Sequence, residues 1–112
     1  MARTKSDILP GTLDLLILKT LSLGPRHGYG IAQHIQRLSD DVLKVEEGSL
    51  YPALQRLELK GWIKSGWRLT PTNRRARYYE LTRTGTRQVG TEERDFDRVV
   101  EAIRRVLTPR EA

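Results

Sequence analysis

The sequence predicts a small α+β fold that is mainly helical, with three helices, a two-stranded β-hairpin and a long C-terminal helix. Three observations predict it. Apolar residues recur at helical spacing in four stretches. Residues 62–81 hold two β-rich runs around a turn-rich tip. The chain has 112 residues without a repeat or a low-complexity linker, which is room for one hydrophobic core.

The first two helices follow a polar tail at residues 1–9. Thr12 to Leu23 is dense in Leu and Ile around most of the helix circumference, as in a helix that is buried on several sides. Gly24-Pro25 is expected to end it. A second helix is expected from about Tyr29 to Leu38, and the polar residues 39–41 break it.

The third helix is expected from Ser49 to Leu59. Ser49 is placed to be its N-cap, because a serine hydroxyl accepts hydrogen bonds from free N–H groups of the first turn. Pro52 fits that turn, where its missing N–H costs nothing, and Gly61 fits the stop. The opposite side of the helix is short and polar, while the buried side carries Leu50, Leu54 and Leu57.

The hairpin is expected from two β-rich runs, Trp62 to Leu69 and Arg77 to Leu81, on either side of the turn-rich residues 70–76. Both tryptophans, Trp62 and Trp67, are expected to pack this hairpin. Three helices followed by a basic hairpin are the order of a winged helix-turn-helix, in which residues 49–59 form the recognition helix and the hairpin forms the wing.

The last helix is expected from Thr82, as its N-cap, to about Leu107. Glu92 interrupts its apolar stripe, and Gly85 and Gly90 weaken its first turns. The stripe follows heptad spacing; its first residue, Val89, could fold back on the preceding domain, but the residues from Phe96 onwards extend too far to be covered by it, so the stripe predicts a homodimer. The residues expected to join the two copies are Val89, Phe96, Val99, Val100, Ile103, Val106 and Leu107.

The positive charge of the chain is confined to one segment. The net charge is +6, and residues 60–87 hold eight basic residues against Glu80 alone. The segments before and after it nearly cancel. A basic block in a neutral background is typical of a surface that binds a polyanion such as nucleic acid. The alternative is a solvated basic face without a partner.

The composition excludes several other classes of protein. Without Cys there is no disulfide framework and no thiolate zinc site, and the two histidines, His27 and His34, lack metal-ligand spacing. No catalytic triad or Gly-rich phosphate loop is present, so we expect no enzyme activity, no metal and no cofactor. No apolar run is long enough to span a bilayer and no signal peptide precedes the domain, which predicts a cytoplasmic protein without a membrane partner.

Several short motifs resemble a known family. The motifs are Gly28-Tyr29-Gly30, residues 47–57 with the run Gly-Ser-Leu-Tyr-Pro-Ala-Leu, Gly61-Trp62-Ile63 and residues 77–82 with Arg-Tyr-Tyr-Glu-Leu-Thr. Together they closely resemble the PadR family of bacterial transcription regulators over about residues 10–90. The resemblance implies a repressor that binds double-stranded DNA as a homodimer through its C-terminal helix, and the single helix after the wing is similar to the shorter subclass.

These expectations divide the chain into a DNA-binding domain at residues 1–81 and a dimerisation helix and tail at residues 82–112. Gln55 suits adenine, Arg56 suits guanine or phosphate, and wing arginines suit phosphates. For Tyr29, a buried packing role is the alternative to DNA contact. The residues expected to contact DNA are Tyr29, Ser49, Tyr51, Gln55, Arg56, Arg74, Arg75 and Arg77.

Two other functions stay open at the level of sequence. One is a winged helix that binds RNA or a protein, and the other is a dimeric scaffold for an aromatic small molecule. The resemblance also leaves room for a small-molecule effector, whose identity nothing in the sequence indicates. Phe96 is the one aromatic residue of the last helix. Two roles stay open for it: it lines a binding site for the effector, or it only packs the dimer.

Overall fold

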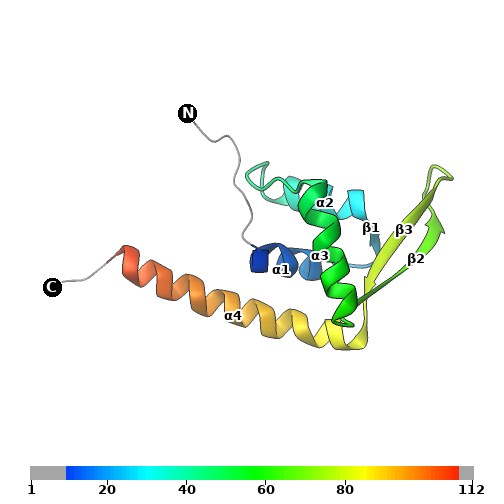
Figure 1. Ribbon diagram of the computed structural model, residues 1–112. Coiled ribbons are helices and arrows are strands. Elements are labelled where there is room, and N and C mark those ends of the chain that lie inside the picture. The colour runs from blue at the N-terminus through cyan, green and yellow to red at the C-terminus, as the bar shows by residue number, and fades with distance from the viewer. Residues whose placement is uncertain (1–9, 109–112) are drawn as a thin grey trace.

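The computed structural model describes residues 10–108, so the polar tail expected at residues 1–9 and the chain after residue 108 lie outside the described part. Figure 1 shows three helices packed together, a hairpin at one end and a long last helix that runs past them. The predicted mainly helical winged helix-turn-helix is confirmed. Its elements are α1 (Pro10–Leu21), β1 (Arg26–His27), α2 (Gly28–Leu38), α3 (Glu47–Leu59), β2 (Ile63–Leu69), β3 (Arg75–Leu81) and α4 (Arg83–Leu107).

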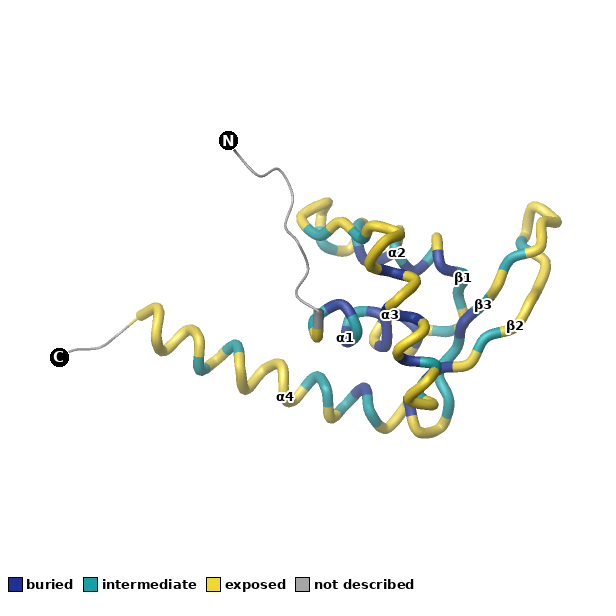
Figure 2. The backbone as a smooth tube through the Cα atoms, in the orientation of Figure 1, coloured by how far each residue is buried: buried dark blue, intermediate teal, exposed yellow. Residues whose placement is uncertain are grey.

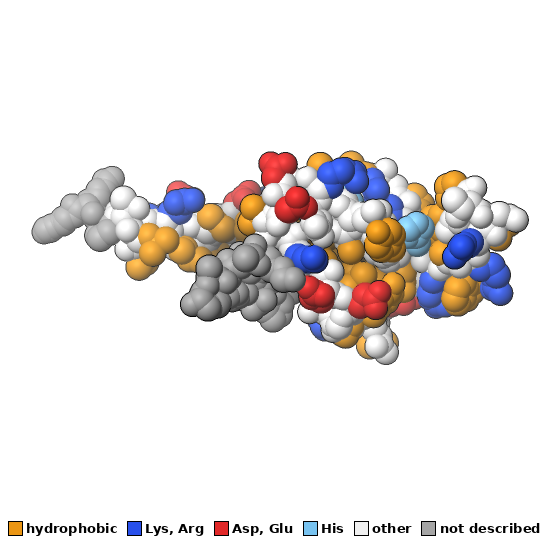
Figure 3. Space-filling view, turned by 90° about the horizontal axis from the view of Figure 1, so that it is seen from above, with side chains coloured by type: hydrophobic (Ala, Val, Ile, Leu, Met, Phe, Trp, Pro, Cys, Tyr) orange, Lys and Arg blue, Asp and Glu red, His pale blue; other side chains and the backbone are white. Residues whose placement is uncertain are grey.

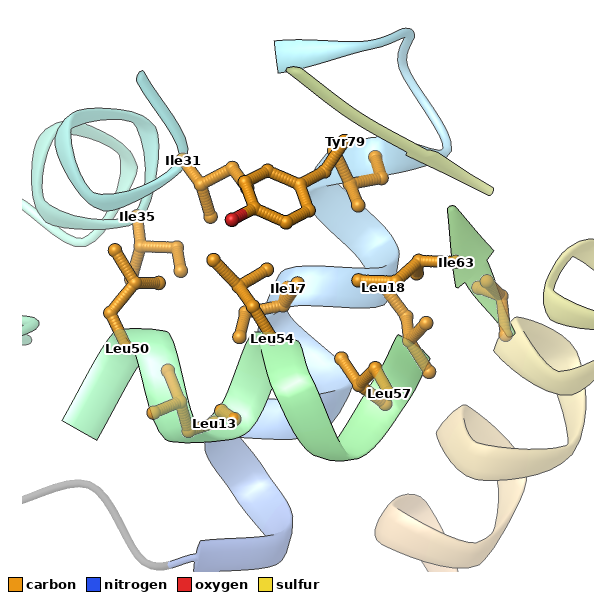
Figure 4. Packing of buried hydrophobic residues seen from close by; sticks show 13 residues of the cluster. Leu13, Ile17, Leu18, Ile31, Ile35, Leu50, Leu54, Leu57, Ile63 and Tyr79 are labelled. Carbon is orange, nitrogen blue, oxygen red and sulfur yellow. The ribbon is translucent and has the colours of Figure 1, made fainter. Parts of the chain in front are cut away.

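The core surrounds α1, as its apolar circumference predicts. Side chains from α2, α3, β2 and β3 converge on it (Figure 4). The three leucines of α3 are buried on one side of that helix, which confirms their predicted face. Because this side of α3 is buried, only residues on the other sides of the helix lie at the surface of the protein. The largest fully buried side chains are Ile17, Leu18, Ile31, Leu50, Leu54, Leu57 and Ile63.

The start of α3 corrects the prediction that Ser49 is its N-cap. The helix begins at Glu47, and Glu46 is the N-cap without a side-chain capping bond. The N–H groups of Ser49 and Leu50 already donate to the Glu46 carbonyl oxygen, at 3.0 and 2.9 Å, which closes the first turn earlier. Carboxylates at this end also suit the positive end of the helix dipole. Pro52 therefore lies in the second turn, not the first.

The boundaries of the first two helices also differ from the prediction. α1 ends at Leu21 because the next residues form single turns, which lead to Gly24 at a φ of 138°. α2 begins at Gly28, one residue before the expected start, and His27 caps it. The imidazole Nδ1 of His27 accepts a hydrogen bond from the Gly30 N–H at 3.0 Å.

The sheet has three antiparallel strands in the order β1-β3-β2, one more than the predicted hairpin. The extra strand, β1, pairs only Arg26 and His27 with β3. β3 begins at Arg75, two residues before the expected start. Ile63 and Tyr79 anchor the base of the hairpin in the core, and the rest of the hairpin projects beyond it (Figure 1).

α4 confirms the predicted cap and the predicted length. Thr82 is the N-cap, and its hydroxyl accepts from the Gly85 N–H at 3.0 Å. Val89 is buried against the core, and Lys19 of α1 bonds Glu93 at 3.1 Å. Beyond this contact α4 leaves the helical body (Figure 2). Its exposed apolar residues there, with the exposed fraction of each, are Phe96 39%, Val99 53%, Ile103 50%, Val106 77% and Leu107 70%.

None of the helices within residues 10–108 combines the length and the apolarity that a bilayer crossing needs.

Candidate nucleic-acid interface

The outward face of α3 follows from the side that it buries. Successive residues turn by about 100° around an α-helix. The direction opposite Leu50, Leu54 and Leu57 is therefore centred on Gly48, Pro52, Gln55 and Leu59, and all four are exposed. Among these four, Gln55 alone has a side chain that can both donate and accept hydrogen bonds. Gln55 therefore lies on the outward face of α3, beside Pro52 and Leu59.

Arg56 lies on one flank of α3 and has a partner inside the chain. Its guanidinium nitrogen Nη2 donates to the Asp14 carboxylate of α1 at 2.8 Å. Ser49 lies on the same flank, seven residues earlier, and is exposed. The pair with Asp14 ties α3 to α1 and turns Arg56 away from the centre of the outward face. Of the two residues expected to read bases, the geometry favours Gln55.

Tyr51 and Tyr29 stand at the N-terminal ends of α3 and α2. Tyr51 lies against Gly28, where an added Cβ would be 2.7 Å from the phenolic oxygen. Tyr29 is 66% exposed, so the alternative that it is a buried packing residue is wrong. Its hydroxyl bonds to the Gln33 side-chain amide at 3.2 Å, and His27 stacks on its ring. Tyr51 is 46% exposed, so both tyrosines form part of the surface.

A cleft of about 460 Å³ separates these helix ends from the hairpin. We call it the aromatic cleft. It joins the N-terminal turn of α3 to the inner face of the wing, so a ligand strand that passes between the two elements crosses it. Its lining residues are His27, Gly28, Tyr29, Tyr51, Trp67, Ala76, Arg77 and Tyr79.

The tip of the wing is held by its own hydrogen bonds. The Thr70 N–H donates to the Arg74 carbonyl at 2.7 Å, and the Arg74 N–H donates to the Thr70 hydroxyl at 3.1 Å. Asn73 has a φ of 65°, a left-handed conformation that asparagine tolerates better than most residues. The closed turn presents Arg74 and Arg75, both exposed, at the end of the hairpin.

The two faces of the hairpin carry different charge. On one face, Lys64 and Arg68 both reach the Glu80 carboxylate, at 3.5 and 3.4 Å. On the other face and at the tip, Arg74, Arg75 and Arg77 form no ion pair with any described residue. Figure 3 shows Lys and Arg side chains around the hairpin end, and most of the visible acidic side chains over the helices. One face and the tip of the wing therefore carry three exposed arginines that no carboxylate of the described residues neutralises.

Two side chains near the interface have shifted pKa values, and both shifts favour the neutral form. Burial lowers the pKa of His34, and Arg26 and Arg37 lower it further. Burial raises the pKa of Tyr79, with smaller contributions in the same direction from Glu58 and Tyr51, while Arg77 opposes them. Both groups are therefore uncharged near neutral pH, which leaves the arginines to set the charge of this surface.

Two residues of this surface were missed by the sequence reasoning. His27 caps α2 and stacks on Tyr29, and its position directly before Gly28-Tyr29-Gly30 was the available signal. Trp67 was expected only to pack the hairpin. It lies 58% exposed on the inner face of the wing, whereas Trp62, which was also expected to pack the hairpin, packs against the core.

Comparison with known proteins identifies relatives over most of the chain. The model of the transcriptional regulator PadR-like family matches residues 17–91. An uncharacterized protein from Lysinibacillus sphaericus is 30% identical over 99 residues, which are 88% of this chain and 91% of that protein.

Solved structures agree with this family match. A transcriptional regulator from Clostridium thermocellum is 31% identical with a TM-score of 0.79, over 89% of this chain and 97% of that chain. A PadR family transcriptional regulator from Eggerthella lenta is 28% identical with a TM-score of 0.72, over 88% and 84% of the two chains. A PadR-like regulator from Bacillus cereus, 24% identical, shares the fold with a TM-score of 0.75, over 92% and 98%.

Proposed function

This chain belongs to the PadR-like family of transcriptional regulators, and from that premise we propose that it is a homodimeric repressor that binds an inverted-repeat operator. The chain is a transcriptional regulator with a winged helix-turn-helix, not an enzyme, and the resemblance found in its sequence is confirmed. The observation that carries the proposal is that Arg77, one of the unpaired arginines of the wing, and Tyr51 of α3 line the same aromatic cleft.

The proposed docking follows from the shape of duplex DNA. A major groove admits one α-helix, so α3 enters it with Gln55 towards the base edges. The wing then lies across the neighbouring backbone, where Arg74, Arg75 and Arg77 meet phosphates. The strand between the two grooves passes along the aromatic cleft, beside the hydroxyls of Tyr51 and Tyr29. Ser49 and Arg56, on the outer flank of α3, are the remaining proposed contacts.

The proposed homodimer rests on the exposed stripe of α4. Its residues repeat every seven positions and continue to Leu107, nearly four turns past Glu93, which pairs with Lys19 of α1. A second copy of the same helix offers the same stripe, and a two-fold axis then sets two copies of α3 side by side. Such a pair matches two half-sites about one helical turn of DNA apart.

The class of ligand is tested by comparing nucleic acids of equal length. The purified chain is titrated, by fluorescence anisotropy, against a duplex DNA, the matching single strand and the matching duplex RNA. We expect the tightest binding to duplex DNA, because the wide major groove of B-form DNA admits α3 and the deep, narrow groove of RNA does not. Equal or tighter binding to RNA would contradict the proposal and favour the RNA-binding alternative.

We expect the wing to contribute affinity without sequence preference. Arg74→Ala combined with Arg75→Ala weakens binding to all duplexes alike, and reduces the salt slope by roughly 1 to 2 units per chain. The matched control is Lys64→Ala with Arg68→Ala, which removes the same number of positive charges from two side chains that are paired with the Glu80 carboxylate. Titrations from low to moderate salt measure the slope. Equal slopes for wild type and the first variant would remove the wing from the interface.

We expect Gln55 to read bases and Arg56 to serve as its control. Gln55→Ala changes the preferred base at one or two positions per half-site, since a good base contact is worth about 1–3 kcal/mol. Arg56→Ala leaves the consensus unchanged and costs at most about 1 kcal/mol of stability, because it removes a half-exposed ion pair. Binding-site selection with each variant measures the consensus sequence that it binds. The opposite pattern, with a changed consensus only for Arg56→Ala, would reverse the assignment.

A further inference from the structure

Trp67 occupies an unusual position for a tryptophan of a small domain. It lies in the middle of β2 with 58% of its surface exposed, and it belongs to no part of the buried core. The guanidinium carbon of Arg75 lies 4.9 Å from the centre of its ring, and that of Arg77 lies 5.7 Å away. Its nearest recorded partners are thus two cations of the neighbouring strand.

The register of the hairpin explains this arrangement. Trp67 is directly opposite Arg77, and Leu69 is directly opposite Arg75, so the four side chains share one face. That face continues the side whose Tyr79 is buried, and it borders the aromatic cleft. The tryptophan ring therefore lies within cation–π distance of both arginines, on the side of the wing that borders the aromatic cleft.

A second contact fixes Arg77, through a chain of hydrogen bonds that ends on α3. Its Nε donates to the Ser65 hydroxyl oxygen at 2.9 Å, and that hydroxyl donates to the Glu58 carboxylate of α3 at 2.6 Å. Among the described residues, neither terminal amino group of Arg77 makes a hydrogen bond. Those two groups, which are the donors suited to a phosphate, remain free while the rest of the side chain is fixed.

We propose that Trp67 is a positioning residue of the DNA interface, which holds Arg75 and Arg77 extended for contact with backbone phosphates. The inference rests on the proposed function. Arginine side chains lose much rotamer freedom when they are fixed by a ligand. Tryptophan is the best aromatic partner for a guanidinium, and a side chain that is already ordered loses less on binding. Trp67 lines the aromatic cleft, but its contribution to affinity comes from ordering Arg75 and Arg77.

A double-mutant cycle with duplex DNA tests the proposal. Trp67→Ala is expected to weaken binding roughly threefold to thirtyfold with the salt slope unchanged, because no charge is removed. In a chain that already carries Arg75→Ala and Arg77→Ala, the same change is expected to alter affinity by less than about twofold. Trp67→Phe keeps a ring face and most of the affinity, whereas Trp67→Leu keeps only apolar bulk and behaves as Trp67→Ala.

Two outcomes of the cycle would overturn the proposal. Equal losses from Trp67→Ala in both backgrounds would mean that Trp67 meets the DNA itself, and no loss in either would mean that it orders nothing. A measurement without DNA separates these failures from a failure of the proposed function. Ring-current shifts of the Arg75 and Arg77 side-chain protons are expected in wild-type NMR spectra and are lost in Trp67→Leu. Unshifted wild-type protons would also contradict the proposal, whatever the chain binds.

Discussion

Replacing Phe96 and Ile103 together by aspartate is expected to give monomers or unfolded chain, and to abolish tight operator binding. Each apolar side chain buried between two copies of α4 contributes about 1.5–3 kcal/mol, and two carboxylates in that interface have no partner for their charge. A monomer also loses the gain in affinity that comes from two linked half-sites. Each single substitution is expected to weaken the dimer in proportion to the burial of its side chain. Sedimentation velocity measures the mass, and anisotropy measures the binding.

The control for this variant lies on the opposite side of the same helix. Arg94→Ala with Arg98→Ala changes the net charge by the same amount, but it leaves the apolar stripe intact. This variant is expected to remain dimeric, with only the loss of DNA affinity that its charge predicts. A folded wild-type chain with a mass near 12.9 kDa at micromolar concentration would contradict the proposed dimer. So would an undiminished dimer in the double aspartate variant.

The second large effect is expected at Gly85, the third residue of α4. A Cβ at this position would lie 1.9 Å from the carbonyl oxygen of Trp62, which is backbone and cannot turn aside. That carbonyl also accepts from the Thr82 N–H at 3.0 Å, so the start of α4 is fastened to the hairpin here. Gly85→Ala is expected to destabilise the fold by about 3 kcal/mol or more, because α4 must separate from β2.

The sign of this effect distinguishes packing from helix propensity. Propensity alone predicts that Gly→Ala inside a helix stabilises it by about 1 kcal/mol. Gly90→Ala is the matched control, since a Cβ there meets only the flexible end of Arg94 at 3.4 Å. Gly90→Ala is expected to stabilise the chain by up to about 1 kcal/mol. Denaturant unfolding at equal protein concentration measures the free energy of unfolding of both variants. A stabilised Gly85→Ala variant would show that α4 does not approach the Trp62 carbonyl as closely as the structure has it.

The elements with strong local signals were predictable from the sequence. The leucines of α3 at helical spacing, the turn residues between β2 and β3, and the Thr82 cap each depend on residues close together in the chain. Local patterns of this kind determine the type of an element because they set its backbone hydrogen bonds and its buried face. The order of the elements then gave the fold class.

The features that the sequence did not reveal depend on contacts between distant residues. β1 has two residues, too few for an alternating pattern, and it exists because it pairs with β3 about fifty residues later. Arg56 finds Asp14 across 42 residues, and this contact decides which polar residue of α3 stays available. Serine is a residue type typical of N-caps, which is why the sequence predicts Ser49 as the cap of α3. The first turn is instead closed by the Glu46 carbonyl, which lies earlier in the chain.

The candidate site shows the same division. The concentration of charge on the wing was visible in the composition, because it needs no tertiary information. The pairing of Lys64 and Arg68 with Glu80, which leaves the other arginines free, required the register of the hairpin. The position of Trp67 beside Arg75 and Arg77 also follows from that register, and period-two alternation across an aligned hairpin was its only sequence signal.

The most direct test of the central claim is a selection from random DNA duplexes with the purified full-length chain, followed by the mass of the complex with the selected duplex. The account predicts one enriched inverted repeat, with half-site centres about one helical turn of DNA apart or a multiple of it, bound by two chains. It is contradicted if no sequence is enriched, or if the enriched motif lacks two-fold symmetry and a single chain binds it.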